Sequence, residues 1–205
     1  MKNIIAAIKK VTAPKAANNK TKTITLDQLT LEKWLKETKT KPTDWEKQWD
    51  LSDDQLGISE EKHIDEDGNF NEKEYLKDYK SAVYTFISNK FDECLNKYKS
   101  FKYPLTLYRG IKVESWDDID FKNIGECWTT DMDAANCYNE HEVKVEKSQL
   151  FILKTEVSKD DINWLGTITN NLNPSFGDDE QEVNLIKGKK INILSDDGES
   201  SIGTV

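Results

Sequence analysis

The spacing of apolar residues predicts helices in the first half of the chain. Apolar side chains recur every three or four residues over 71–98, which favours one long amphipathic helix or two shorter ones. A further helix is predicted over 25–38, because Thr25 and Gln28 have the Thr-x-x-Gln spacing of a capping box. Two other clusters have the composition of helix starts, Pro42-Thr43-Asp44 and Ser52-Asp53-Asp54.

The second half of the chain has short apolar runs between turn residues, a pattern typical of strands. The clearest runs are 105–111 and 150–157. Shorter strands are predicted over 125–130, 162–168, 182–186, 191–194 and 202–205, with a short helix over 131–138 and a loop over 170–179. Because helices come first and strands later, this order predicts an α+β fold.

Length and charge distribution suggest the domain organisation. A chain of 205 residues is the size of one ordinary domain. We expect that domain over 23–205, with a helical part over 23–100 and a mostly β core over 101–205. Residues 1–22 contain six lysines and no acid, which predicts a basic, flexible arm. The arm is either simply solvated or in contact with an acidic partner.

Composition argues against several classes of function. The formal net charge is −9, so nucleic acid is not expected as the main partner. The apolar run from Ile4 to Ile8 is too short for a membrane span or a signal-peptide core. Three cysteines without a Cys-x-x-Cys pair, and two histidines, favour neither a disulfide framework nor a metal site. We therefore expect a cytoplasmic protein without a membrane partner or a bound metal.

Residues 63–74 partly match a calcium-binding EF-hand loop. Counted from the first residue, positions 3, 5, 6 and 12 have the expected types, which are Asp65, Asp67, Gly68 and Glu74. His63 stands at position 1, where the loop needs an oxygen ligand. The ordinary interpretation is an Asp-Gly turn followed by a helix, with a calcium sensor as an alternative.

Arg109 is the single arginine among the 29 basic residues of the chain. It lies in a predicted strand between Tyr108 and Gly110. The planar guanidinium of arginine can bind a phosphate or a carboxylate through two hydrogen bonds at once, which the ammonium group of lysine does not do. Gly110 permits close approach of a ligand to the backbone. A coding bias toward lysine also explains the count, and a lone arginine in a strand is more often a surface residue.

Two polar elements follow Arg109 along the chain. Trp128-Thr129-Thr130 stands at a predicted strand end before a short helix. Glu180 and Glu182 enter a strand after a polar loop, and the two-residue period of a strand puts both carboxylates on one face. Paired carboxylates can stabilise a developing cation while one of them orients or deprotonates a nucleophile. Taken singly, the threonines are an ordinary helix cap and the glutamates an ordinary solvated strand edge.

In this order the three elements resemble the catalytic pattern of the mono-ADP-ribosyltransferases, in the branch with an Arg, a Ser-Thr-Ser-like element and a Glu-x-Glu pair. The matching residues are Tyr108-Arg109-Gly110, Trp128-Thr129-Thr130 and Glu180-Gln181-Glu182-Val183. The resemblance covers about residues 75–195. It implies a two-sheet, mixed β core that binds NAD as a co-substrate. The branch with a histidine in the first motif is disfavoured, because neither His63 nor His141 lies in the first core strand.

The resemblance also implies residue roles. Arg109 is expected to bind the diphosphate of NAD, and the backbone of Gly110 the nicotinamide amide. Thr130, with Thr129 beside it, is expected to support the pocket and the catalytic glutamate. Trp128 stands where the family usually has a serine, and an alternative register runs from Thr129 to Asp131. Glu182 is expected to bind the ribose next to nicotinamide and to stabilise its oxocarbenium-like state.

The remaining family features concern the acceptor. Members with a glutamate at the position of Glu180 usually modify arginine, and Phe176 in the preceding loop is the expected substrate contact. In size and layout the chain resembles the intracellular enzymes of T-even-type bacteriophages, which implies a protein acceptor in host transcription or translation. Two alternatives remain, an NAD glycohydrolase and a non-catalytic acidic interaction or decoy protein on the same scaffold.

Overall fold

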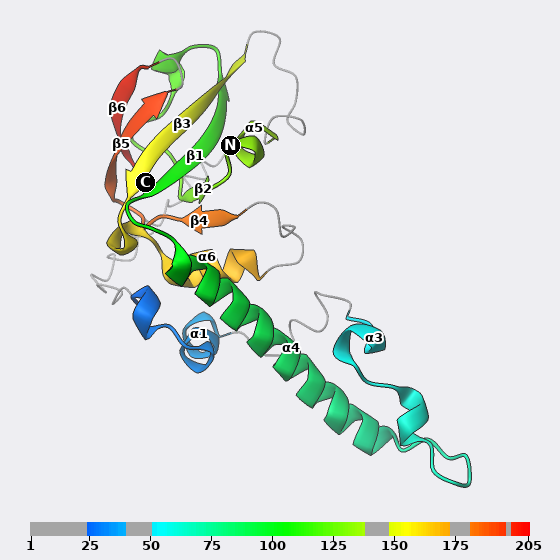
Figure 1. Cartoon of the computed structure of the whole chain (residues 1–205). Helices are drawn as coiled ribbons and strands as arrows, with labels where there is room; N and C mark the ends of the chain where they lie inside the picture. Colours follow the sequence, from blue (N-terminus) through cyan, green and yellow to red (C-terminus); the bar gives the residue numbers. More distant parts are fainter. Residues whose placement is uncertain (1–23, 40–50, 138–147, 173–180, 196–197) are drawn as a thin grey trace, which may run out of the picture.

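The computed structural model describes residues 24–39, 51–137, 148–172, 181–195 and 198–205. A β-sheet body lies at one end of the molecule, and a long helix, α4, extends away from it (Figure 1). The predicted α+β class is confirmed. Among the described segments, no helix combines the length and apolar composition that a membrane crossing requires.

The strands form one six-stranded sheet in the order β4-β2-β1-β3-β5-β6, and every described pair is antiparallel. Their bounds are β1 Leu105–Val113, β2 Cys127–Thr129, β3 Gln149–Val157, β4 Glu182–Asn184, β5 Lys190–Ser195 and β6 Ser200–Thr204. The expectation of two mixed sheets is therefore wrong for the described residues. β1 pairs along its full length with β3 and at Tyr108 with β2, so the two halves of the β core stay joined through one strand.

One predicted strand is a helix. Residues 162–168 fall largely in α6, which spans Trp164–Asn171. Asn163 caps this helix by accepting a hydrogen bond from the backbone N–H of Gly166 at 3.2 Å. Trp164 and Ile168, four residues apart, are both buried on its inner face. A run this short does not distinguish a helix from a strand by its apolar content. The cap at Asn163 favours the helix, because it satisfies a backbone N–H of the first turn.

The helices of the first half largely follow the prediction. Their bounds, with the shorter helices of the second half, are η1 Leu26–Gln28, α1 Leu31–Thr38, α3 Asp53–Leu56, η2 Glu60–His63, α4 Glu72–Ser100, η3 Trp116–Asp118, α5 Met132–Cys137 and η4 Lys159–Asp161. Ser52 caps α3 in a capping box with Gln55, as its cluster predicts. The predicted start at Pro42 lies outside the described residues.

The cap predicted at Thr25 is wrong, because its side chain makes no capping hydrogen bond. A short 3₁₀ turn follows instead, closed by the N–H of Leu29 on the carbonyl of Leu26. Both leucines are buried, which favours this turn over a continuous helix. Thr30 is the actual cap of α1 and accepts from the N–H of Lys33 at 3.2 Å.

Aromatic packing joins the C-terminal half of α4 to the helices around it. Trp34 of α1 lies 5.9 Å from Phe91, and Tyr98 lies 5.7 Å from Trp164 of α6, measured between ring centroids. Trp34 also donates from Nε1 to the hydroxyl of Thr169 at 3.1 Å. These contacts place α6 against both α1 and α4, and α6 in turn borders the sheet edge at β4.

The N-terminal end of α4 contributes little to this core, with Tyr79 packed against it only partly buried. All the buried residues of the helix come at or after Val83. Its first turns carry α3, η2 and a turn at residues 65–68 away from the sheet (Figure 1). We call residues 51–78 the distal arm.

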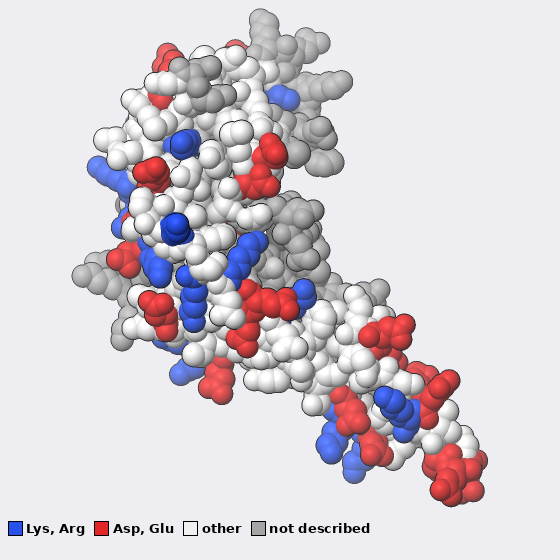
Figure 2. All heavy atoms as spheres, viewed as in Figure 1, with Lys and Arg blue, Asp and Glu red and all other residues white. Residues whose placement is uncertain are grey.

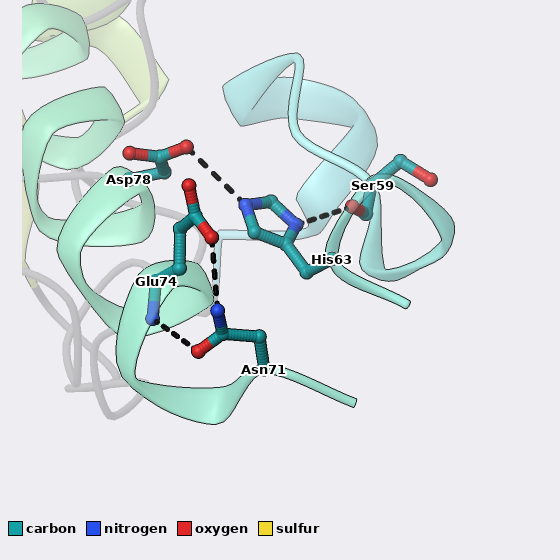
Figure 3. A network of polar contacts seen from close by, with 5 residues as sticks. All are labelled: Ser59, His63, Asn71, Glu74 and Asp78. Carbon is teal, nitrogen blue, oxygen red and sulfur yellow. Dashed lines mark hydrogen bonds and ion pairs between the residues drawn. The ribbon is translucent and has the colours of Figure 1, made fainter. Parts of the chain in front are cut away.

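His63 holds the distal arm together (Figure 3). Its Nδ1 lies 2.9 Å from the carbonyl oxygen of Ser59, and its Nε2 lies 3.2 Å from a carboxylate oxygen of Asp78. The carbonyl and the carboxylate can only accept hydrogen bonds, so the two contacts favour the imidazolium form of His63, with a proton on each ring nitrogen. The hydrogen bond to Ser59, followed by that to Asp78, raises the pKa of His63, and the charge of Glu74 acts in the same direction.

Titration tests this network. We expect His63 to have a pKa above the 6.5 of an ordinary histidine. Because folding raises the pKa, the network stabilises the fold fully below about pH 6.5 and loses this contribution as the pH rises through the folded-state pKa. NMR titration of the ring C–H resonance, assigned with His63→Gln, measures the value. Asp78→Asn is expected to lower it, and an unchanged pKa in that variant would contradict the ion pair.

Candidate functional site

The sheet brings the three motifs of the sequence onto neighbouring strands. Tyr108 of β1 pairs with Thr129 of β2, and Thr129 pairs with Glu182 of β4. Directly paired residues of antiparallel strands project from the same face. Tyr108, Thr129 and Glu182 therefore form one row across the end of the sheet.

Arg109 of β1 lies against the segment that leads into β2. Its Nη1 donates to the carbonyl of Cys127, and its Nε is buried without a hydrogen-bond partner among the described residues. Gly125 has a φ of +88°, and a Cβ there would lie 2.8 Å from Nη2 of Arg109. The guanidinium thus lies directly against the glycine backbone. Arg109 pairs with the buried Leu153, so its side chain leaves the strand on the face opposite to Tyr108.

Three side chains from two helices hold Glu182. Asn170 of α6 donates from Nδ2 to the carboxylate Oε1 at 2.6 Å. The main-chain carbonyl of Glu182 accepts from Nδ2 of Asn171 at 2.6 Å and from the hydroxyl of Tyr98 at 2.9 Å. Tyr98 is fully buried, and burial raises the pKa of its phenol. Both the backbone and the carboxylate of this residue are therefore positioned.

Cys127 is a member of this cluster that the sequence analysis missed. Its thiol donates to Oδ1 of Asn184 at 3.4 Å. Desolvation, followed by a hydrogen bond to Glu182 and its charge, raises the pKa of Cys127 to about 11, while Arg109 acts in the opposite direction. The signal was present, because Cys127 stands two residues before Thr129 and so shares its face of the strand.

The two threonines of the motif have different partners. Thr129 lies beside Glu182, whereas the hydroxyl of Thr130 donates to Oε1 of Gln181 at 2.7 Å. Trp128 is buried on the opposite face and donates from Nε1 to the carbonyl of Gly125 at 3.2 Å. Of the two threonines, Thr129 is therefore the one that stands opposite Glu182 on the paired strand.

The space over Gly110 is taken by the protein itself. A Cβ on Gly110 would collide with the main-chain carbonyl oxygen of Ala135 in α5. The close approach expected for a ligand is therefore made by a helix. This contact explains the glycine by packing alone.

Two candidate residues, Glu180 and Phe176, lie outside the described residues. The interpretation of 63–74 as an Asp-Gly turn followed by a helix is confirmed. The carboxylate of Asp65 accepts from the backbone N–H groups of Asp67 and Asn69 at 3.0 and 2.7 Å, and α4 begins at Glu72. Within the described segments, no group of three or more His, Cys, Asp or Glu side chains is arranged to hold a metal ion.

No protein-family model matches the chain, and the searches of curated proteins and of solved structures find no match either. An interpretation of the site therefore rests on its residues and their geometry.

Alkylation of Cys127 tests whether the cluster is assembled as described. At mildly alkaline pH we expect maleimide to label this thiol slowly although the residue is exposed, because a pKa of about 11 leaves little thiolate. Glu182→Gln removes a negative charge and a hydrogen-bond acceptor near the thiol, so it should lower the pKa of Cys127. Each pKa unit of that decrease should speed the labelling of Cys127 by roughly tenfold. Peptide mass spectrometry measures labelling at this residue.

Glu126→Gln is the matched control for that experiment. This variant removes the carboxylate of Glu126, the neighbour of Cys127 in sequence. The charge of Glu126 contributes least to the raised pKa of the Cys127 thiol. Equal acceleration by the two variants would mean that Glu182 has no specific contact with the thiol.

Proposed function

We propose that this protein transfers ADP-ribose from NAD to a side chain of an acceptor protein, with arginine as the acceptor residue. The observation that carries the proposal is the row formed by Tyr108, Thr129 and Glu182 on one face of the sheet. Arg109 leaves β1 on the other face, and its guanidinium binds the main-chain carbonyl of Cys127 in β2. Three motifs far apart in the sequence, each weak alone, stand on adjacent strands as a shared site requires. The proposal rests on this juxtaposition and on the family resemblance of the motifs.

The carboxylate of Glu182 suits the central step. The bond between nicotinamide and ribose C1′ breaks, its electron pair leaves with neutral nicotinamide, and positive charge develops on the ribose. A carboxylate held by Asn170 stabilises that charge without first having to reorient. An acceptor nitrogen then forms the new bond to C1′ and loses a proton. Glu180 is the residue proposed to pair with the acceptor guanidinium.

Arg109 suits the diphosphate of NAD. Its Nη1 is committed to the carbonyl of Cys127, so the remaining N–H groups of the guanidinium are the proposed donors to the phosphate oxygens. The buried Nε without a described partner is consistent with such a role. A lysine offers a single point of charge and lacks this planar set of donors.

The cellular setting belongs to the same proposal. By resemblance in size and layout to phage enzymes, the proposed acceptor is a component of host transcription or translation in the host cytoplasm.

Transfer of label from adenylate-labelled NAD tests the activity directly. With a bacterial lysate or a small guanidine as the acceptor, we expect label transfer by the wild type. Glu182→Gln should slow it about 10²–10³-fold, because the developing charge loses its carboxylate. Arg109→Lys should mainly raise the KM for NAD, since the positive charge stays and the planar set of donors is lost.

Nicotinamide release separates the alternatives. Release without label on any acceptor would favour an NAD glycohydrolase. Neither release nor transfer by a folded wild-type protein would contradict the proposal and favour an interaction protein. Glu180→Gln should abolish transfer to a guanidine but preserve nicotinamide release, which assigns Glu180 to the acceptor.

Asn170 provides a test of positioning. Asn170→Ala removes the described donor to the Glu182 carboxylate, so we expect kcat to fall about tenfold with little change in the KM for NAD. Asn171→Ala is the control, because it removes a donor to the main-chain carbonyl of the same residue. That variant should lower the thermal stability more than it lowers kcat. Equal kcat values for wild type and Asn170→Ala would show that the contact has no part in turnover.

A further inference from the structure

The tip of the distal arm presents a pair of apolar side chains to solvent. Ile64 and Phe70 are 47% and 46% exposed, and they face each other across an isolated antiparallel bridge. Phe70 also packs against Tyr75 of α4, with 5.4 Å between ring centroids. The two exposed side chains thus form one small apolar knob at the end of the arm. We call residues 60–72 the arm tip.

Negative charge surrounds this knob. The arm tip contains six acids, one lysine and His63, so its formal net charge is −5 with the histidine counted as neutral. Acidic side chains gather at the outer end of the arm (Figure 2). The same small segment therefore has more than half of the −9 net charge of the whole chain.

The arm tip is braced against α4, and α4 is in turn bonded to α3. His63 bonds the carbonyl of Ser59, just before the arm tip, and the carboxylate of Asp78 on α4 (Figure 3). The hydroxyl of Tyr75 donates to Asp53 of α3 at 2.9 Å. The N–H of Asn71 donates to the carbonyl of His63 at 2.7 Å and closes the hairpin. A surface fixed in this way loses less conformational entropy on binding than a flexible loop.

We propose that the arm tip is a docking surface for a basic protein segment, one with lysine or arginine side chains around an apolar residue. Charge complementarity selects this partner. An acidic rim attracts a cationic segment, and the knob of Ile64 and Phe70 gives the apolar contact at the centre of the interface. Nucleic acid and acidic membranes are repelled by this surface, and a second copy of the arm tip has the same sign of charge. Docking here needs no NAD chemistry and stands apart from the proposed transferase activity.

Fluorescence anisotropy with the full-length chain tests the proposal. The probe is a labelled peptide of repeated Lys-Lys-Leu triplets, and the matching Glu-Glu-Leu peptide is the control. We expect the basic peptide to bind and the acidic one not to bind, with affinity falling as salt rises. A quadruple arm-tip variant should weaken binding about tenfold or more, through the changes Glu61→Gln, Glu66→Gln, Asp67→Asn and Glu72→Gln.

A body variant with the same change in net charge is the matched control. It neutralises four exposed acids on or near the sheet, through Glu114→Gln, Asp117→Asn, Glu156→Gln and Asp160→Asn. We expect it to weaken binding by less than about threefold, because these residues lie away from the arm tip. Circular dichroism checks that both variants are folded.

A separate change tests the apolar knob. Phe70→Ser should weaken binding of the basic peptide at high salt, where charge attraction is screened and the apolar contact carries more of the affinity. Equal losses in the arm-tip and body variants would show that net charge alone attracts the peptide and would overturn the proposal. Unchanged binding in all the variants, or no binding to the wild type, would overturn it as well.

Discussion

The position of β4 depends on the buried hydroxyl of Tyr98. This residue lies near the end of α4, packs against Trp164 and donates to the main-chain carbonyl of Glu182. A buried tyrosine hydroxyl needs such a partner, because an unpaired polar group in the core is costly. One hydrogen bond therefore connects the helical part of the chain to the edge strand of the sheet. The neighbouring amides of α6 then complete the support of Glu182.

A second constraint acts around Arg109. Gly125 leaves room for its guanidinium, because any Cβ at that position would meet it. The main-chain carbonyl of Cys127 accepts a hydrogen bond from Arg109. The arginine thus has a structural contact in its own right, and the proposed diphosphate site would be built on an arginine that the fold already orients.

The molecule places its two proposed sites far apart. The motif residues lie across β1, β2 and β4, while the arm tip lies at the other end of α4 (Figure 1). The early turns of α4 contribute no buried side chain to the core. Their local contacts are those of His63 with Ser59 and Asp78, together with the packing of Phe70 against Tyr75.

Local features were predictable from the sequence wherever short-range chemistry decides them. The long helix, the strands at 105–111 and 150–157 and the Asp-Gly turn follow from periodicity, β-rich composition and turn residues. The motif residues could be singled out by type and order. Prediction failed at 162–168, where a short apolar run fits either a helix or a strand, and at Thr25, where burial of two leucines selects a 3₁₀ turn.

Only the tertiary structure decided how these pieces meet. Strand pairing is non-local, so the sequence did not show that Thr129 rather than Thr130 lies beside Glu182, or that the strands join in one sheet. The support from Asn170, Asn171 and Tyr98 comes from helices distant in sequence, and no local pattern reports such contacts. The chain by itself determined which residue types stand in the three motifs, and strand pairing and packing determined which of them lie side by side.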